Sequence, residues 1–246
     1  MRLRGGAAVA VLIMLSVAGC KDTTGASGSE ATTGGDSGGN SGGGSGGGAA
    51  LTAAESLTVK GRAPKTGYSR ERFGTAWADT DSNSCDTRDD ILKRDLKQVK
   101  FTGGTCKVSY GVLESDPYSG KEVTYRRGAS LVDIDHLVAL SDAWQKGAKY
   151  WDASKRIALA NDPLNLLTVG ASANRSKGDG DTATWVPPKA YRCTYVAAQV
   201  AVKKKYGLWV TAAEKAAMKK VLSTCPGQKL PSGGNPTNAP SRFHAK

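Results

Sequence analysis

The stretch "DIDHLVAL" covers residues 133–140 and contains one of only two histidines in the 246-residue chain. Two carboxylates, Asp133 and Asp135, stand within three residues of His136. A lone histidine beside an aspartate most often serves the structure, where it satisfies a hydrogen bond. The role of His136 must therefore be inferred from the residues around this stretch.

Short elements flank the stretch on both sides. Residues 131–135 (LVDID) and 165–169 (NLLTV) have the apolar composition of short strands. Between them, residues 137–148 predict a helix that stops at Gly147, and residues 152–160 predict another that stops before a proline.

The outer parts of the chain add helices and one strand pair. Thr87 and Asp90 form a cap signal before an apolar stripe that runs to Val99, and Thr211 and Glu214 form a capping box. Residues 106–127 predict two strands joined by a turn at 116–120, and residues 187–207 predict a long helix. The fold class is α+β, with a small antiparallel element inside a mostly helical frame.

The segment after the second inner strand is polar and rich in asparagine and glycine. Asn165 stands at the start of that strand, and Asn174 follows it. A basic turn, "RSKGD" at residues 175–179, comes next. The order is Asp-His, strand, two spaced asparagines, then the basic turn.

This ordered set resembles the HNH, or ββα-metal, nuclease motif in its variant with Asn at the last position. The resemblance implies a core of two strands and a helix, with the helix and loop between Ala139 and Pro163 inserted between the strands. More widely, "RFGTAWADTDSNSCDTR" (72–88) and "YRCTYVAAQVAVKKKYGLWVT" (191–211) are similar to the secreted HNH proteins of the domain-of-unknown-function 1524 group. That likeness covers nearly all of residues 68–225.

The resemblance also implies roles for single residues. His136 would be the general base, and Asp135 and Asn174 would be metal ligands. Asn165 would complete the catalytic set by holding a loop through hydrogen bonds. Asp133 either orients the site or is a strand-end carboxylate.

Two basic residues follow the last asparagine. Arg175 and Lys177 either bind a phosphate near a helix start or form a solvated basic turn.

The chemistry of these residue types fits phosphodiester hydrolysis. A neutral imidazole can accept a proton from water near pH 7. A hard cation can bind a phosphate oxygen and the leaving oxygen, and it prefers oxygen ligands such as a carboxylate and an amide. The expected cofactor is a divalent metal, Mg²⁺ first and Mn²⁺ second.

The N-terminal end predicts export. Residues 1–19 form a lipoprotein signal peptide, with two arginines before an apolar run too short to span a bilayer. Its end resembles a bacterial lipobox, which implies a lipid on Cys20; a plain signal peptide cut nearby is the alternative. The chain would then be lipid-anchored to the outer face of the bacterial cell membrane, or secreted.

The rest of the chain divides into three parts by composition. Residues 20–50 form a Gly/Ser-rich disordered linker behind the anchor, residues 51–228 the folded domain, and residues 229–246 a second disordered segment.

Four cysteines remain in the predicted domain, an even number in an exported chain. They allow three pairings. We favour Cys85–Cys106 and Cys193–Cys225, because each pair brackets one compact segment.

The net charge of +12 belongs to the domain and the segment after it, because the first 50 residues carry three basic and three acidic side chains. Such a domain suits a polyanionic partner. The favoured function is a metal-dependent endonuclease on nucleic acid, DNA before RNA, with little sequence specificity and with membrane contact only through the anchor. The alternative is a lipid-anchored protein that binds extracellular DNA or another polyanion without cutting it.

Overall fold

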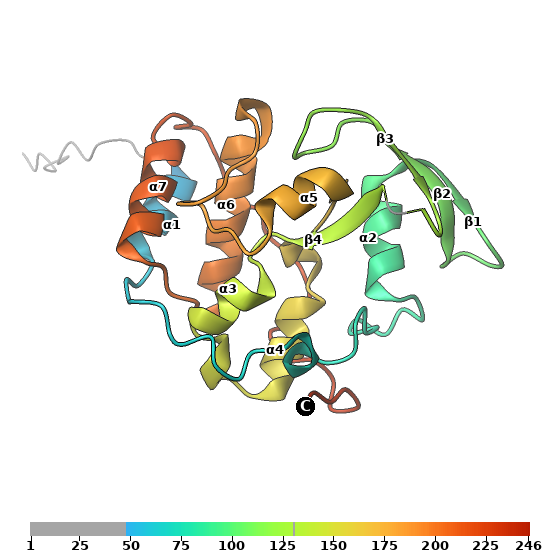
Figure 1. Ribbon diagram of the computed structural model, residues 1–246, viewed down its shortest axis with the longest axis horizontal. Helices are drawn as coiled ribbons and strands as arrows, with labels where there is room; N and C mark the ends of the chain where they lie inside the picture. Colours follow the sequence, from blue (N-terminus) through green and yellow to red (C-terminus); the bar gives the residue numbers. More distant parts are fainter. Residues whose placement is uncertain (1–47, 130) are drawn as a thin grey trace, which may run out of the picture. The chain divides into compact units, whose positions relative to one another are not determined.

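The computed structural model describes residues 48–129 and 131–246 (Figure 1). The predicted signal peptide (1–19), the lipidation site Cys20 and most of the linker (20–50) lie outside the described residues. The helices are α1 (Ala49–Ser56), α2 (Thr87–Asp95), α3 (Leu140–Gln145), α4 (Ala153–Ala160), α5 (Ala171–Lys177), α6 (Lys189–Tyr206) and α7 (Ala212–Leu222). Short 3₁₀ turns are η1 (Arg70–Phe73), η2 (Ala148–Tyr150) and η3 (Pro163–Asn165).

Within the described residues, five strands form two small antiparallel sheets. The first has the order β1 (Lys97–Phe101), β2 (Val108–Leu113), β3 (Val123–Arg126). The second pairs β4 (Val132–His136) with β5 (Leu166–Gly170), so that His136 lies opposite Leu166 and Val132 opposite Gly170. The α+β class is confirmed, and α3 and α4 lie in the chain between the two strands of the second sheet.

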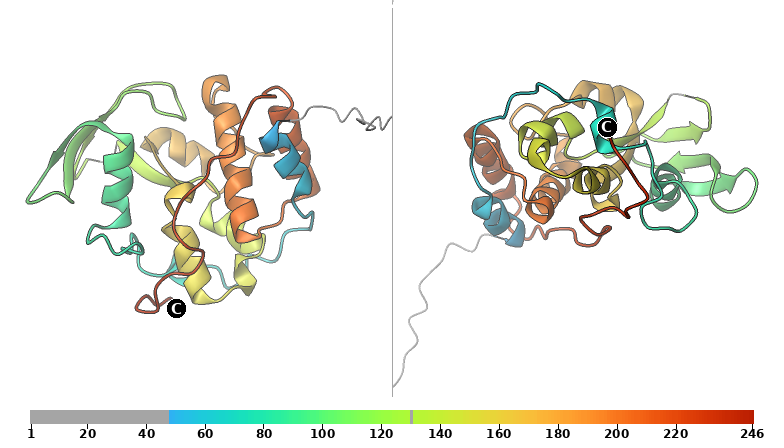
Figure 2. Two further views of the ribbon diagram at one scale, coloured as in Figure 1. Left: turned by 180° about the vertical axis from the view of Figure 1, so that it is seen from behind. Right: turned by 90° about the horizontal axis from the view of Figure 1, so that it is seen from below.

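Long helix α6 is the centre of the helical part. One side of α6 packs against α1 and α7, and the other side packs against α3 and α4 (Figures 1 and 2). A third apolar cluster joins α2 to the three-stranded sheet and to β4, through Ile91, Leu92, Tyr125 and Ile134. The β4–β5 pair lies between these two parts of the domain (Figure 1).

Helix α2 begins and ends earlier than the sequence pattern predicts. Asp86 is the N-cap and accepts from the Asp89 amide at 2.7 Å, because the Thr87 hydroxyl donates to the Ala78 carbonyl instead. The helix ends at Asp95, and Val99 belongs to β1.

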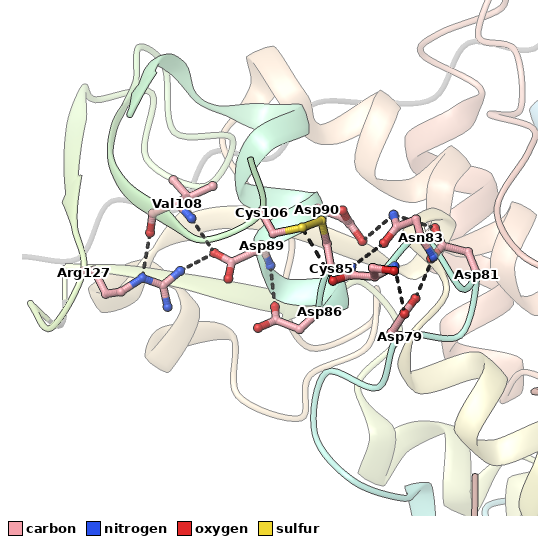
Figure 3. Close-up of a disulfide and its surroundings, with 11 residues drawn as sticks. Asp79, Asp81, Asn83, Cys85, Asp86, Asp89, Asp90, Cys106, Val108 and Arg127 are labelled. Carbon is pink, nitrogen blue, oxygen red and sulfur yellow. Dashed lines mark hydrogen bonds and ion pairs between the residues drawn. A yellow bond between two sulfur atoms is a disulfide. The ribbon is translucent and has the colours of Figure 1, made fainter. Parts of the chain in front are cut away.

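Both predicted disulfides are confirmed. Cys85–Cys106 joins the loop before α2 to the turn before β2, and Cys193–Cys225 joins α6 to the end of α7. Figure 3 shows the first bridge beside Asp89, whose carboxylate accepts from the Val108 amide at 3.0 Å and pairs with Arg127. The disulfide and this ion pair fix α2 against the first sheet.

The segment 229–246 differs from its prediction as a disordered tail. It has no helix or strand, but it lies along α6 and α4 (Figure 2). Ala239 exchanges hydrogen bonds with Ser154 of α4, and the Asn235 amide donates to Asp162 at 3.2 Å. These backbone bonds, with Phe243 packed against the α4 cluster, order a segment whose composition favours disorder.

A buried ionic cluster joins five separate parts of the chain. The Lys146 ammonium contacts Asp142, Asp181 and Glu214 at 2.7, 2.8 and 2.6 Å. Lys203 pairs with Asp142 and Glu214, and Arg62 pairs with Asp142 and Asp181. Three cations balance three anions, which is the condition under which charges tolerate burial.

The charges in this cluster shift each other's titration. Burial alone would lower the pKa of Lys203, but the charges of Asp142 and Glu214 outweigh it and raise that pKa above its ordinary value. Burial would raise the pKa of Asp142, yet Lys203 and Lys146 bring it down to about 2. Glu214 was predicted to reach back in a capping box; only the Thr211 half forms, because the Glu214 carboxylate serves the cluster.

We predict that Lys146→Met lowers the free energy of unfolding by about 3–5 kcal/mol, because it leaves buried carboxylates without their central cation. Lys149→Met is the matched control: this half-buried lysine makes one long contact, to the Pro64 carbonyl at 3.4 Å, and should change stability by less than about 0.5 kcal/mol. Urea unfolding of both variants is the measurement. Equal stability of the two would contradict a central role for Lys146.

Candidate active site

The β4–β5 pair and α5 bring the sequence-predicted residues together. Helix α5 starts at Ala171, directly after β5 ends at Gly170. Successive side chains on a strand point to opposite faces. Asp133 and Asp135 of β4 therefore both face α5, whereas His136 faces the end of α4 and the segment around Trp77.

His136 is buried and held in one tautomer. Its Nε2 lies 2.9 Å from the Ala160 carbonyl oxygen. A carbonyl only accepts, so Nε2 carries the hydrogen and Nδ1 keeps the lone pair. Burial lowers the pKa of His136 from 6.5 to about 3, against the opposing effect of the Ala160 carbonyl, and the positive charges of Arg70 and Lys177 lower it further. The ring is neutral at pH 7.

Asp135 is buried between two donors. Its Oδ2 accepts from the Tyr118 hydroxyl at 2.5 Å, and its Oδ1 accepts from the Lys177 ammonium at 3.0 Å. Burial raises the pKa of the Asp135 carboxyl, although Lys177 and Tyr118 oppose the shift. Burial and the Asp135 charge raise the pKa of Tyr118 well above its ordinary value.

Lys177 lies in a different place from either expectation for it. Its side chain is fully buried, and its ammonium donates to Asp135 and to the His136 carbonyl at 2.9 Å. The sequence placed it on a basic turn, but α5 extends through residue 177 and turns this side chain inward. Arg175, two residues earlier on α5, is exposed.

Asp133 and Asn174 are paired at the mouth of the site. The Asn174 side-chain amide donates to Asp133 Oδ2 at 3.0 Å. Asn174 therefore contacts Asp133 in this structure rather than Asp135. Both side chains are only half-buried, so their polar atoms can meet solvent.

Asn165 is fully buried and ties two chain segments together. Its Oδ1 accepts from the Val138 amide at 2.9 Å, and its Nδ2 donates to the carbonyls of Val138 and Leu159 at 3.4 and 3.3 Å. It fixes the chain that leaves β4 against the end of α4. Its amide has no free group to offer a ligand.

His136 stands between two clefts. The polar cleft, of about 260 Å³, is lined by Tyr68, Arg70, Ile134, Asp135, His136, Ala139, Leu140, Asn174, Arg175, Gly178 and Asp179. The aromatic cleft, of about 380 Å³, is lined by Arg70, Glu71, Phe73, Gly74, Thr75, Ala76, Trp77, His136, Leu140, Ala160 and Asn161. Arg70, Leu140 and His136 belong to both.

Sequence reasoning missed Arg70. This residue begins the 3₁₀ turn η1 and lies just before the "RFGTAW" stretch. Arg70 and Arg175 are both exposed, and in residues 48–129 and 131–246 no carboxylate pairs with either guanidinium. An arginine without a partner beside a neutral histidine is a ready binding group for phosphate.

The oxygen donors at the polar cleft suit a hard cation. Asp135 and Asn174 line this cleft, and Asp133 is hydrogen-bonded to Asn174. The three side chains offer carboxylate and amide oxygens, and Mg²⁺ accepts few protein ligands because it keeps several waters. Within the described ranges no group of three His, Cys, Asp or Glu side chains is arranged to hold a metal ion. Carboxylate and amide oxygens of this kind suit a cation that keeps most of its waters, such as Mg²⁺.

Together the structure shows an α+β domain in which the β4–β5 pair and α5 bring together a neutral imidazole, carboxylate and amide oxygens, and two exposed arginines. Residues 86–221 match the family model of the C-terminal domain of GmrSD restriction endonucleases. The chain belongs to this family, which indicates a nuclease-type function.

A relative shares much of the sequence. A protein named as an uncharacterized secreted protein of Arthroderma benhamiae is 42% identical over 179 residues, which cover 72% of this chain and 84% of the relative. No solved structure matches the chain. Over the part of the chain that the structure describes, no helix combines the length and apolar character needed to cross a bilayer.

We predict that His136 makes stability depend on acid. Its folded pKa, about 3, lies below its ordinary 6.5, so between these values the unfolded chain binds a proton that the folded chain does not. The free energy of unfolding should fall as the pH drops from 6.5 toward 3, with the full contribution present above 6.5. In His136→Gln this part of the fall should be absent. Urea unfolding of both proteins from about pH 4 to pH 7 measures it; parallel pH curves would show that His136 titrates normally.

Proposed function

We propose that this protein is a metal-dependent HNH-type endonuclease that hydrolyses phosphodiester bonds of nucleic acid, DNA in the first place, outside the cytoplasm. The observation that carries the proposal is the neutral, oriented His136 at the edge of a cleft that also holds Asn174 and two unpaired arginines. The family match supports the nuclease class. The succession β4, β5, α5 supports the ββα type.

His136 would act as general base. Its Nδ1 lone pair accepts a proton from the attacking water, while the Ala160 carbonyl holds Nε2–H and stabilises the imidazolium that forms. Because burial keeps the ring neutral, the base is available throughout the physiological pH range. Arg70 and Arg175 bind the phosphate and offset the charge that develops on it.

Asp135 and Asn174 would hold the metal, with Asp133 as a third oxygen donor. Bound Mg²⁺ or Mn²⁺ would stabilise the phosphorane charge and the leaving oxygen. Asn174 now donates to Asp133, but a half-turn of its amide would present its oxygen beside that carboxylate. Lys177 and Tyr118 hold the Asp135 carboxylate in place through one hydrogen bond to each of its oxygens.

Location and substrate follow from charge and cysteine chemistry. Two disulfides suit an oxidising compartment, and the relative is named a secreted protein. The proposed signal peptide and the lipid on Cys20 would deliver the domain there. The net charge of +12 favours a polyanionic substrate and binding through phosphates with little sequence preference.

The same charge would also suit a lipid-anchored protein that binds DNA without cutting it. Incubation of plasmid DNA with Mg²⁺, with and without a chelator, separates the two. Nicking that the chelator abolishes supports the nuclease, whereas retention without cleavage supports the binder.

We predict that His136→Ala lowers the cleavage rate by about 10²- to 10⁴-fold, because it removes the proton acceptor. DNA binding should persist, since the arginines remain. His244→Ala is the matched control: the second histidine is exposed near the C-terminal end, and its loss should leave the rate unchanged. Cleavage by His136→Ala at the wild-type rate would show that the histidine is structural.

We predict opposite signatures for the two asparagines. Asn174→Ala removes a metal ligand, so the Mg²⁺ concentration for half-maximal rate should rise with little change in melting temperature. Asn165→Ala leaves the Val138 amide and two carbonyls unpaired, costing about 1–3 kcal/mol of stability for a buried group, with the metal requirement unchanged. Mg²⁺ titrations and thermal melts of both variants test this prediction. A raised Mg²⁺ requirement in Asn165→Ala and a lowered melting temperature in Asn174→Ala would mean that Asn165 binds the metal and Asn174 holds the fold.

A further inference from the structure

The aromatic cleft beside His136 is left unused by the chemistry described above. It continues from the polar cleft across His136 and Arg70, which line both. Its volume of about 380 Å³ lies in the range of pockets that take small organic groups. A group bound there would touch the same histidine that the proposed mechanism uses as its base.

Trp77 gives this cleft a flat apolar surface. Its ring is half-buried and lies within 9° of parallel to the His136 ring, with 6.1 Å between the ring centres. Phe73 adds a second aromatic side chain to the lining. The half-buried Trp77 ring in an open cleft suits a planar ring, which stacks on it irrespective of its identity.

The backbone holds Trp77 in a costly conformation. Its φ is +61°, in the left-handed region that bulky residues rarely adopt. The Trp77 carbonyl accepts from the Thr87 amide at 3.3 Å, and the next carbonyl, of Ala78, accepts from the Thr87 hydroxyl at 2.6 Å. The N-terminus of α2 thus stabilises a strained residue beside the site, which points to a purpose for its position.

Asn161 adds an unpaired acceptor to the lining. Its Nδ2 donates to the Ile157 carbonyl at 3.0 Å, which fixes the amide, but its Oδ1 is buried and accepts no hydrogen bond from the described residues. A buried acceptor without a donor is unfavourable. An N–H on a bound ring, reached by a small movement of the Asn161 side chain, would satisfy it.

We propose that the aromatic cleft is a subsite for one unpaired nucleobase next to the scissile phosphate, so that the enzyme prefers single-stranded or locally unpaired nucleic acid. This inference rests on the proposed nuclease function and adds the substrate class. A phosphate in the polar cleft bound by Arg70 would place the neighbouring base over His136 and toward Trp77. A base inside a duplex must leave the stack before it can enter the aromatic cleft. Unstacking and unpairing cost free energy in a duplex, whereas in a single strand the base is already unpaired.

The test measures binding by the full chain in the presence of a chelator, so that nothing is cut. The probes are a fluorescently labelled single strand, the same strand with abasic sites scanned along it, and the matching duplex. We expect wild-type protein to bind the single strand more tightly than the duplex and to lose affinity when the abasic site meets the cleft. Trp77→Ala should weaken single-strand binding by about 5- to 150-fold, as for other stacked bases, and duplex binding by less than about two-fold.

Two further variants keep the result interpretable. Trp77→Phe retains a smaller ring and should bind the single strand with intermediate affinity, which provides a readout should Trp77→Ala unfold. Trp209→Ala replaces another half-buried tryptophan, one that stacks on Tyr150 outside both clefts, and should leave the preference for single strands intact.

The outcomes separate this inference from the proposed function. Wild-type binding that is indifferent to abasic sites, or a Trp77→Phe protein equal to the wild type on both probes, overturns the subsite even where DNA is cut. If the protein binds single strands in a base-dependent way but does not cleave DNA in Mg²⁺, the base subsite is supported and the proposed nuclease activity is contradicted.

Discussion

The pairing of β4 with β5 is the constraint on which the site depends. Five residue pairs, from Val132–Gly170 to His136–Leu166, join strands that are separated by residues 137–165. This register puts Asp135 and His136 at the end of one strand and starts α5 at the end of the other. A slip of one residue would turn both acids away from α5 and His136 toward it. Asn165 and the Arg94 guanidinium, which donates to the Leu166 carbonyl at 2.7 Å, help to fix that register.

Much of this arrangement could be predicted from local sequence. The strand that ends at His136, the strand that follows Asn165 and the helices around them follow from composition and caps, because each of these signals lies within a few residues. Both disulfides follow from the even number of cysteines and their spacing along the chain. That Asp135 and His136 face opposite ways also follows from the strand period alone. The residues that the sequence did not indicate all depend on long-range contacts. Arg70 and Trp77 come from a segment more than fifty residues before His136, and no periodicity marks them.

The buried lysines show the same limit in another way. Lys146, Lys177 and Lys203 look like surface residues in the sequence, and Lys203 belongs to a run of three. Each is buried because carboxylates from distant elements meet it. A run of lysines predicts an exposed helix face only where no buried carboxylate pairs with them. Carboxylates such as Asp181 and Glu214 are distant in sequence, so they are recognised as partners only from the fold. The C-terminal segment follows the same logic: its polar composition predicts disorder, whereas Ser154 and Asp162 supply hydrogen bonds that order it.

Burial and pairing together explain how a histidine flanked by two acids stays neutral. An unpaired carboxylate close to an imidazole would raise the imidazole pKa. Asp135 instead points to the other face of β4, where Lys177 offsets its charge, and the Lys177 and Arg70 charges oppose protonation of His136. Burial of the ring adds the largest effect in the same direction. The Asp135 carboxylate thus faces α5, while His136 on the opposite face of β4 stays neutral and keeps the lone pair on Nδ1. Because the two side chains lie on opposite faces of one strand, the acid can stay charged without favouring protonation of the base.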